Sequence, residues 1–220
     1  MKVPSSEAGA AFFHRIDGQG PPVVLIGGLY SQPGDYRRLI APLAQSYQVI
    51  TVCPFSTPRP RAERQPGPVV LAAQMADFLQ RLRAGPACIL GVSAGGGLAA
   101  DLAIHHPHLI DSLILVSANL WQPATASRGR LIAKSLHLPV PPRPPVPDRA
   151  LDQIRIPTLI VHGSRDAVAP FSAAERAQAQ IAGSQLVRVP GGHGFLFVRP
   201  KQLCELVLAF LHRGQGSEGI

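Results

Sequence analysis

The sequence has few cysteines and no long apolar run, and both shortages narrow the class of protein. Cys53, Cys88 and Cys204 are odd in number and far apart, which argues against a disulfide framework and predicts reduced core thiols. No apolar stretch reaches the roughly 18 residues of a membrane span. The N-terminus lacks the basic region and apolar run of a signal peptide. We therefore expect a cytoplasmic protein with no membrane span.

Acidic residues and lysines are also scarce. Thirteen Asp and Glu against 21 Lys and Arg give a formal net charge of +8. Only Lys2, Lys134 and Lys201 are lysines, and the arginines are scattered rather than lined along one helix. Aromatic residues make up 5% of the chain, so no stacking platform accompanies the basic charge. A basic but ordinary surface is the favoured interpretation, with no nucleic-acid partner.

Short apolar runs alternate with amphipathic segments along most of the 220 residues. This alternation is typical of an α/β fold, a three-layer, doubly wound, mostly parallel sheet. The length suits a single domain over residues 1–220. Strands are expected at Ala11–Ile16, Val23–Ile26, Val49–Cys53, Ala87–Leu90, Leu113–Ser117, Thr158–His162 and Leu186–Val189, and helices at Asp35–Ala44, Val69–Arg83, Ala94–His106, Ala173–Ala182 and Lys201–His212.

Ser93 stands between two glycines in the stretch Gly91-Val92-Ser93-Ala94-Gly95. A Gly-x-Ser-x-Gly sequence forms a sharp nucleophile elbow when a strand precedes it and a helix follows, because glycines let the two pass closely. A glycine-rich chain also produces this pentapeptide by chance. Here an apolar run precedes it and an Ala-rich segment follows, so Ser93 is the predicted nucleophile.

A nucleophilic serine needs a base, and the base needs a group that orients it. Asp166 lies in a polar loop after the apolar run Pro157–Val161, which predicts it as the acid. His193 lies in the loop Gly191–Gly194 after another strand-like run, which predicts it as the base. The order Ser, Asp, His is the one that accompanies this elbow.

The other histidines have different interpretations. His105, His106 and His108 cluster at a predicted helix end, where cations complement the helix dipole. No Cys or carboxylate stands beside them at metal-ligand spacing. His162 ends a predicted strand, where a packing or hydrogen-bonding role is favoured. No metal or cofactor is expected.

On these motifs the sequence resembles the α/β-hydrolase family from roughly Ala11 to Leu211. The resemblance implies an oxyanion hole made by the backbone N–H groups of Ala94 and Leu29. Many family members carry His-Gly where this chain has Gly27 and Gly28. The matching segments are Val23–Leu29, the elbow, the acid loop Val161–Asp166 and the histidine loop Gly191–His193.

Two further segments are predicted to meet substrate. Residues 119–152 break the alternation where the family commonly inserts a cap, and they predict a short lid. Trp121 and the apolar residues of an expected helix at 127–138 either line an acyl groove or pack the lid onto the body. In the proline-rich loop 54–68, Arg59, Arg61 and Arg64 either attract an anionic part of the substrate or are simply solvated.

These features predict a serine hydrolase that cleaves a carboxylic ester or thioester of a small-molecule acyl substrate through an acyl-enzyme. One alternative is a biosynthetic relative with non-hydrolytic or carbon–carbon chemistry, such as a cyclase, lyase or perhydrolase. A second alternative is a non-catalytic ligand-binding relative. The complete Ser, Asp and His set favours catalysis over binding, whereas the sequence does not discriminate between the types of bond.

Overall fold

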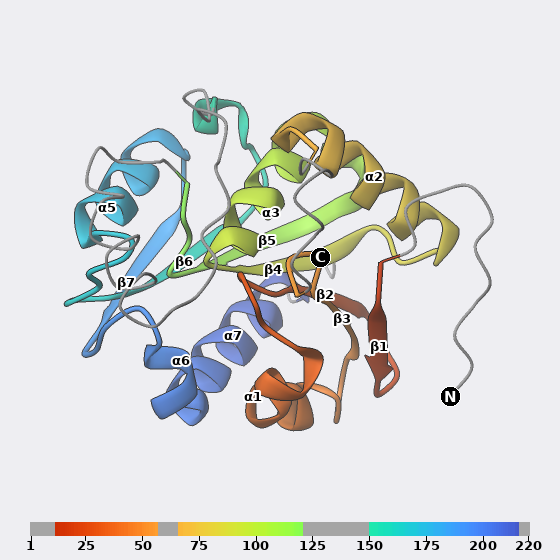
Figure 1. The fold of residues 1–220 in the computed structure, drawn as a ribbon, viewed down its shortest axis with the longest axis horizontal. Coiled ribbons are helices and arrows are strands. Elements are labelled where there is room, and N and C mark those ends of the chain that lie inside the picture. The colour runs from red at the N-terminus through yellow and green to blue at the C-terminus, as the bar shows by residue number, and fades with distance from the viewer. Residues whose placement is uncertain (1–11, 57–65, 121–149, 216–220) are drawn as a thin grey trace.

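The computed structural model describes residues 12–56, 66–120 and 150–215, whose strands form a seven-stranded sheet (Figure 1). The sheet order is β1-β3-β2-β4-β5-β6-β7, with every pair of neighbours parallel except the antiparallel pair β1 and β3. The predicted fold class is therefore confirmed. The strands are β1 His14–Asp17, β2 Pro22–Ile26, β3 Gln48–Val52, β4 Ala87–Val92, β5 Ile110–Val116, β6 Thr158–Gly163 and β7 Gln185–Val189.

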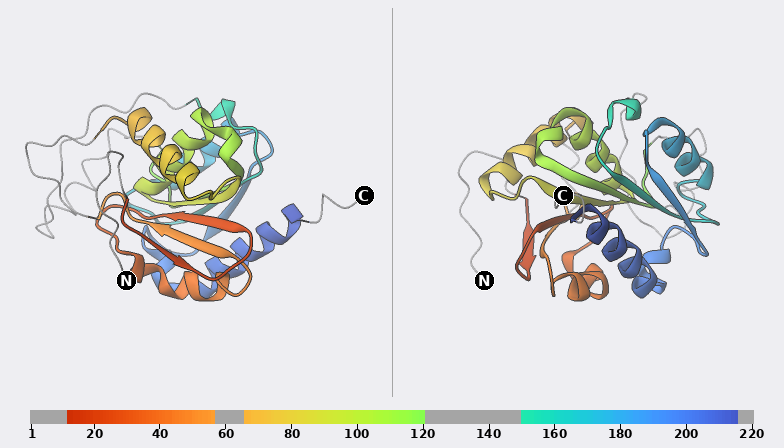
Figure 2. Two further views of the ribbon diagram at one scale, coloured as in Figure 1. Left: turned by 90° about the vertical axis from the view of Figure 1, so that its right-hand side faces the viewer. Right: turned by 180° about the vertical axis from the view of Figure 1, so that it is seen from behind.

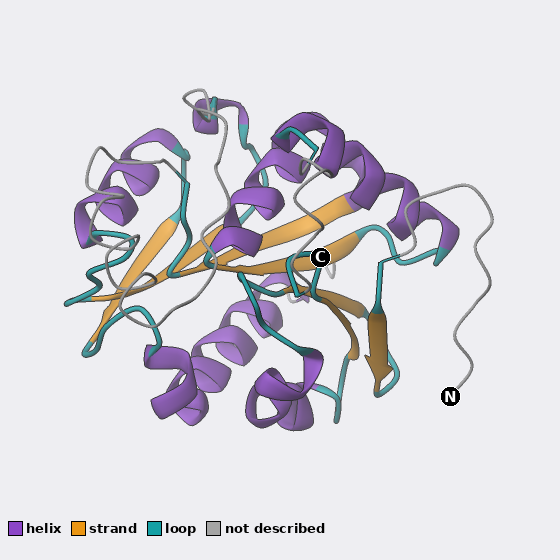
Figure 3. Cartoon of the chain, viewed as in Figure 1, coloured by secondary structure: helices purple, strands orange, loops and turns teal. Residues whose placement is uncertain are grey.

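Helices cover both faces of this sheet (Figures 2 and 3). One layer contains α2, α3 and α5, and the opposite layer contains α1, α6 and α7. The helices are α1 Arg37–Leu43, α2 Pro68–Arg81, α3 Ala94–His105, α5 Phe171–Gln180, α6 Phe195–Val198 and α7 Pro200–Gln215, with short 3-10 helices η1 Pro33–Tyr36, η2 Pro107–Leu109 and η3 Leu151–Gln153.

The central strands are mostly apolar because helices cover both faces of the sheet. All residues of β4 and β6 are buried. Alternate side chains enter different cores: Ile89 packs on the α2 and α3 side, whereas Leu90 packs on the α1 and α7 side. Such continuous burial is typical of parallel sheets. Because the strands are parallel, the segments that follow β2, β4, β6 and β7 all meet at one edge of the sheet.

The predicted elements lie close to the observed ones, and most differences are at element ends; β5, for example, begins at Ile110 rather than Leu113. The edge strand begins at His14 rather than Ala11. The first helical segment opens as a 3-10 turn with Pro33 at its start, before α1 begins at Arg37. The four-residue helix α6, whose Phe195 and Leu196 are buried, was not predicted.

The three cysteines are free and buried, as predicted. Cys53 directly follows β3, Cys88 lies in β4 and Cys204 lies in α7. Within the residues that the structure describes, no helix is long and apolar enough to cross a membrane.

Candidate active site

Ser93 lies at the junction of β4 and α3 in a strained backbone conformation. Its φ of 53° and ψ of −115° fall outside the regions that residues with a side chain ordinarily adopt. Gly95, two residues on, packs against the backbone carbonyl groups of Ile26 and Gly27 so closely that a Cβ atom would overlap them. The elbow therefore holds Ser93 directly beside the loop that follows β2.

The structure brings Ser93, His193 and Asp166 together in one hydrogen-bonded chain. Nε2 of His193 lies 2.9 Å from Oγ of Ser93, and Nδ1 of His193 lies 2.8 Å from Oδ2 of Asp166. Asp166 follows β6, and His193 follows β7 in the glycine loop. Gly163, at the end of β6, lies against that loop, since a Cβ there would be 2.6 Å from the carbonyl oxygen of Gly192.

Backbone and side-chain groups hold the Asp166 carboxylate in place. Its Oδ1 accepts the N–H groups of Val168 and Ala169, both at 2.8 Å, and its side chain is fully buried. Burial opposes ionisation, but contacts with His162 and His193 and the Ala169 N–H outweigh it and hold the Asp166 pKa well below the ordinary aspartate value. The carboxylate is therefore ionised at neutral pH.

This charge state determines which partner donates each proton. An ionised carboxylate only accepts, so Nδ1 of His193 carries hydrogen and donates to Asp166. In the tautomer with hydrogen on Nδ1, Nε2 has a lone pair that accepts the hydroxyl hydrogen of Ser93. The His193 side chain is a quarter exposed, at 26%. The arrangement is competent to activate a serine nucleophile.

His162 lies behind the acid and is 1% exposed. Its Nε2 donates to the carbonyl oxygen of Ala169 at 2.8 Å and lies 3.4 Å from Oδ2 of Asp166. Because a carbonyl oxygen only accepts, Nε2 of His162 must carry hydrogen. The hydrogen-bonding role expected for His162 is therefore observed, and it serves the loop that carries Asp166.

Two backbone N–H groups near Ser93 have no acceptor among the described residues. They belong to Leu29 and to Ala94, the first residue of α3. The N–H groups at the start of a helix have no partner within the helix, so the Ala94 N–H can donate to another group. Gly28, beside Leu29, lies against Ser93, since a Cβ there would be 3.2 Å from the serine Cβ.

The residues predicted to contact substrate are not among those that the structure describes. Trp121, Arg59, Arg61 and Arg64 lie outside the described residues, as does most of the predicted lid at 119–152. Ser31 and Tyr36, which form hydrogen bonds with the loop after β2, were not predicted from the sequence. No motif marks them, since their importance comes from hydrogen bonds formed only in the folded chain.

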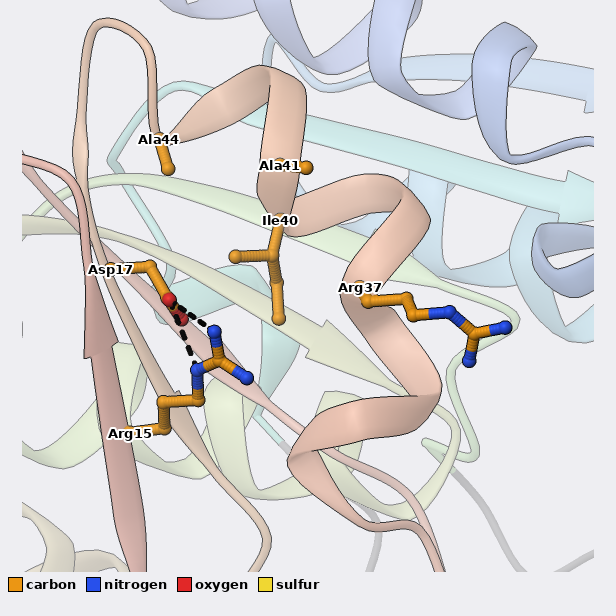
Figure 4. Close-up of a pocket in the computed structure, with 6 residues that line it drawn as sticks. All are labelled: Arg15, Asp17, Arg37, Ile40, Ala41 and Ala44. Atoms are coloured by element: carbon orange, nitrogen blue, oxygen red, sulfur yellow. Dashed lines mark hydrogen bonds and ion pairs between the residues drawn. The ribbon is translucent and has the colours of Figure 1, made fainter. Parts of the chain in front are cut away.

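Two surface hollows in the described part of the chain lie apart from Ser93, His193 and Asp166. One of about 120 Å³ lies between β1 and α1, where Arg15 pairs with Asp17 and Arg37 points away from that pair (Figure 4). A larger hollow of about 500 Å³ lies between the η1–α1 segment and α6. Among the residues described, no three His, Cys, Asp or Glu side chains are grouped to hold a metal ion.

Comparisons with known proteins agree with this geometry. Residues 21–136 match the family described as alpha/beta hydrolase fold, and residues 124–218 match the one described as TAP-like protein. An uncharacterized protein of Mycobacterium tuberculosis is 26% identical over 271 residues, covering 93% of this chain and 79% of that protein.

Solved structures show the same fold at lower identity. An esterase from Exiguobacterium antarcticum has a TM-score of 0.79 at 21% identity, covering 91% of this chain and 95% of the esterase. A meta-cleavage product hydrolase from Pseudomonas fluorescens has a TM-score of 0.71 at 22% identity, covering 91% of this chain and 93% of that hydrolase. At these identities the likeness establishes the fold alone.

A mostly parallel sheet between two helical layers, with a strained serine at the carboxyl end of a central strand, defines the class of α/β proteins built around a nucleophile elbow. The chain belongs to the alpha/beta hydrolase fold family, whose members are generally hydrolases.

Proposed function

We propose that this protein is a serine hydrolase that cleaves a carboxylic ester or thioester through an acyl-enzyme. The observation that carries the proposal is the unbroken chain from the Ser93 hydroxyl through His193 to the buried carboxylate of Asp166, with separations of 2.9 and 2.8 Å. Ser93 is the nucleophile, His193 the general base and Asp166 the group that orients the imidazole.

In the first half-reaction, Ser93 Oγ attacks the acyl carbonyl carbon while its proton passes to Nε2 of His193. The carbonyl electron pair moves onto oxygen, and the N–H groups of Leu29 and Ala94 bind this oxyanion. When the electron pair on the oxyanion re-forms the carbonyl bond, the bond from the acyl carbon to the alcohol or thiol breaks, and His193 protonates this leaving group. The acyl group is then esterified to Ser93.

In the second half-reaction, water replaces the leaving group. His193 takes a proton from the water as its oxygen attacks the acyl carbon, and the same N–H groups bind the second oxyanion. Collapse releases the carboxylic acid, and the proton returns from His193 to Ser93 Oγ. The cycle requires no metal or cofactor, because every proton and electron pair is accounted for by these groups and water.

The substrate contacts are part of the proposal. We assign Trp121 to the acyl portion of the substrate, and Arg59 and Arg61 to an anionic portion. A residence in the cytoplasm is supported by the three free, buried cysteines.

The direct test is hydrolysis of matched esters and thioesters of graded acyl length, with a burst experiment to detect the acyl-enzyme. We expect turnover of at least one series and a mass increase equal to the acyl group on Ser93. Correctly folded protein that turns over neither series, and that no activated ester acylates, would refute the proposed hydrolase.

A further inference from the structure

We propose that Ser31 and Tyr36 are positioning residues of the oxyanion hole: they fix the two peptide groups around Gly28 so that the Leu29 N–H faces the reacting carbonyl oxygen. The inference rests on the proposed function and adds a mechanism by which this chain builds one half of the hole. Neither residue touches the reacting atoms, and both act through the backbone between β2 and η1.

Three N–H groups of this loop already have acceptors. The N–H of Gly27 donates to the carbonyl oxygen of Val52 at 2.8 Å. The N–H of Tyr30 donates to the carbonyl oxygen of Phe55 at 3.1 Å. The N–H of Gly28 donates to the hydroxyl oxygen of Tyr36 at 3.1 Å. Leu29 lies between these occupied positions, and its N–H has no acceptor among the residues described.

Ser31 determines the direction of the free N–H. The carbonyl oxygen of Gly28 accepts the Ser31 hydroxyl at 2.8 Å and the Ser31 N–H at 3.4 Å. That carbonyl and the Leu29 N–H belong to the same peptide group, which is trans. In a planar trans peptide the C=O and the N–H point in opposite directions. By holding the carbonyl on one side, Ser31 directs the Leu29 N–H to the other.

Tyr36 fixes the preceding peptide group, between Gly27 and Gly28, by accepting the Gly28 N–H. Its side chain is 2% exposed, and burial raises the pKa of its hydroxyl, so the group stays neutral at working pH. Ser31 is also buried, at 8% exposure. Water therefore has little access to compete for either hydrogen bond.

The chain needs such a device because two successive glycines form the loop. Glycine adopts many backbone conformations, and a peptide group beside one can rotate at small cost. A rotated Gly28–Leu29 peptide would present its carbonyl oxygen to the oxyanion and would remove a donor. Side-chain contacts on both neighbouring peptide groups select the orientation that keeps the donor in place.

The test compares Ser31→Ala and Tyr36→Phe with wild type, using Tyr47→Phe as the matched control. Tyr47 is equally buried, at 2%, in the same helix-covered core, and it lies away from the loop. We expect kcat to fall by roughly tenfold to a hundredfold in the two variants, below the about 10²–10³-fold cost of deleting a donor outright. KM should stay within about twofold.

Affinity for a transition-state analogue, a trifluoromethyl ketone, should fall in parallel with kcat/KM, because this ligand forms the oxyanion. Ser31→Thr keeps the hydroxyl donor and should recover most of the lost kcat. Tyr47→Phe should match wild type in both measurements. Unchanged kcat and analogue affinity in Ser31→Ala and Tyr36→Phe, or an equal loss in Tyr47→Phe, would overturn the assignment.

Amide hydrogen exchange separates this inference from the proposed hydrolase activity. The Gly28 amide should exchange slowly in wild type and faster in Tyr36→Phe, whether or not an ester is cleaved. Equal Gly28 exchange in the two proteins would overturn the positioning role. Wild-type protein that lacks esterase and thioesterase activity, but shows the expected exchange difference, would refute the hydrolase proposal and leave the loop geometry established.

Discussion

Nε2 of His193 lies 2.9 Å from Oγ of Ser93, although 100 positions separate the two residues in the sequence. The sheet produces this contact, because β4 and β7 run parallel and end at the same edge. Only the glycine loop that carries His193 must reach back across the ends of β5 and β6. The contact between Ser93 and His193 is therefore a consequence of strand order and of where each strand stops.

Ser93→Ala and His193→Ala should each abolish nearly all ester hydrolysis, by about 10⁴-fold or more, because either change removes the activated nucleophile. The double variant should lose little more than either single one. Initial rates on an activated ester would measure this. Ser117→Ala, at the end of β5, is a suitable control, since its buried hydroxyl bonds no described residue. Strictly additive losses would show that Ser93 and His193 do not act as a unit.

Asp166 should make the protein more stable at neutral pH than in acid. Its pKa in the folded state is lower than in the unfolded chain, so the unfolded chain binds the proton more readily. The stabilisation is complete above the ordinary aspartate pKa of about 3.9 and is lost as pH falls toward the lower folded-state value.

Urea unfolding from pH 7 down to pH 3 would test this expectation. Asp166→Asn should be less stable than wild type at pH 7, and the difference should shrink in acid. Asp77→Asn, which removes an exposed ion pair with Arg81 on α2, should follow the wild-type pH dependence. A gap between Asp166→Asn and wild type that does not change with pH would argue against an ionised, stabilising carboxylate.

Gly163→Ala should push the end of β6, which precedes Asp166, away from the loop that carries His193. The added Cβ would lie 2.6 Å from the Gly192 carbonyl oxygen and 2.8 Å from that of Gly191, so the backbone must move. We expect a loss of stability of about 1–3 kcal/mol and a loss of activity of at least tenfold. Gly34→Ala, where a Cβ would meet nothing within 4 Å, should change neither property. Full activity in Gly163→Ala would mean that the loop tolerates displacement.

His162→Leu should destabilise the loop that carries Asp166. The change leaves the Ala169 carbonyl oxygen buried without its donor, which costs about 1–3 kcal/mol. His162→Gln retains an N–H near the Nε2 position and should recover part of that loss. Thermal unfolding of the two variants would measure the difference, and equal stability of the Leu variant and wild type would exclude the role.

The sequence predicts the strands and the proximity of Ser93, Asp166 and His193, because both depend on local pattern and chain order. Apolar runs such as Ala87–Leu90 are typical of parallel strands buried on both faces, and the residues that follow parallel strands meet at one edge. Ser93 and Asp166 follow two such runs and His193 follows the edge strand β7, so their positions predict their proximity without any knowledge of side-chain contacts.

Other features depend on tertiary contacts that leave no periodic pattern. Helix α6 spans four residues, too few to show helical periodicity, and exists because Phe195 and Leu196 pack into the core. The hydrogen bond from the Gly28 N–H to Tyr36 connects residues eight positions apart through a 3-10 turn. Neither Ser31 nor Tyr36 belongs to a recognisable motif, so only the folded structure identifies them.

The central claim is that Ser93 is an activated nucleophile, and intact-mass analysis after exposure to a fluorophosphonate tests it without knowledge of the substrate. We predict a single adduct on wild type and none on Ser93→Ala, with a slower rate of labelling in His193→Ala. Correctly folded wild-type protein that takes up no adduct, or equal labelling of wild type and Ser93→Ala, would contradict the account.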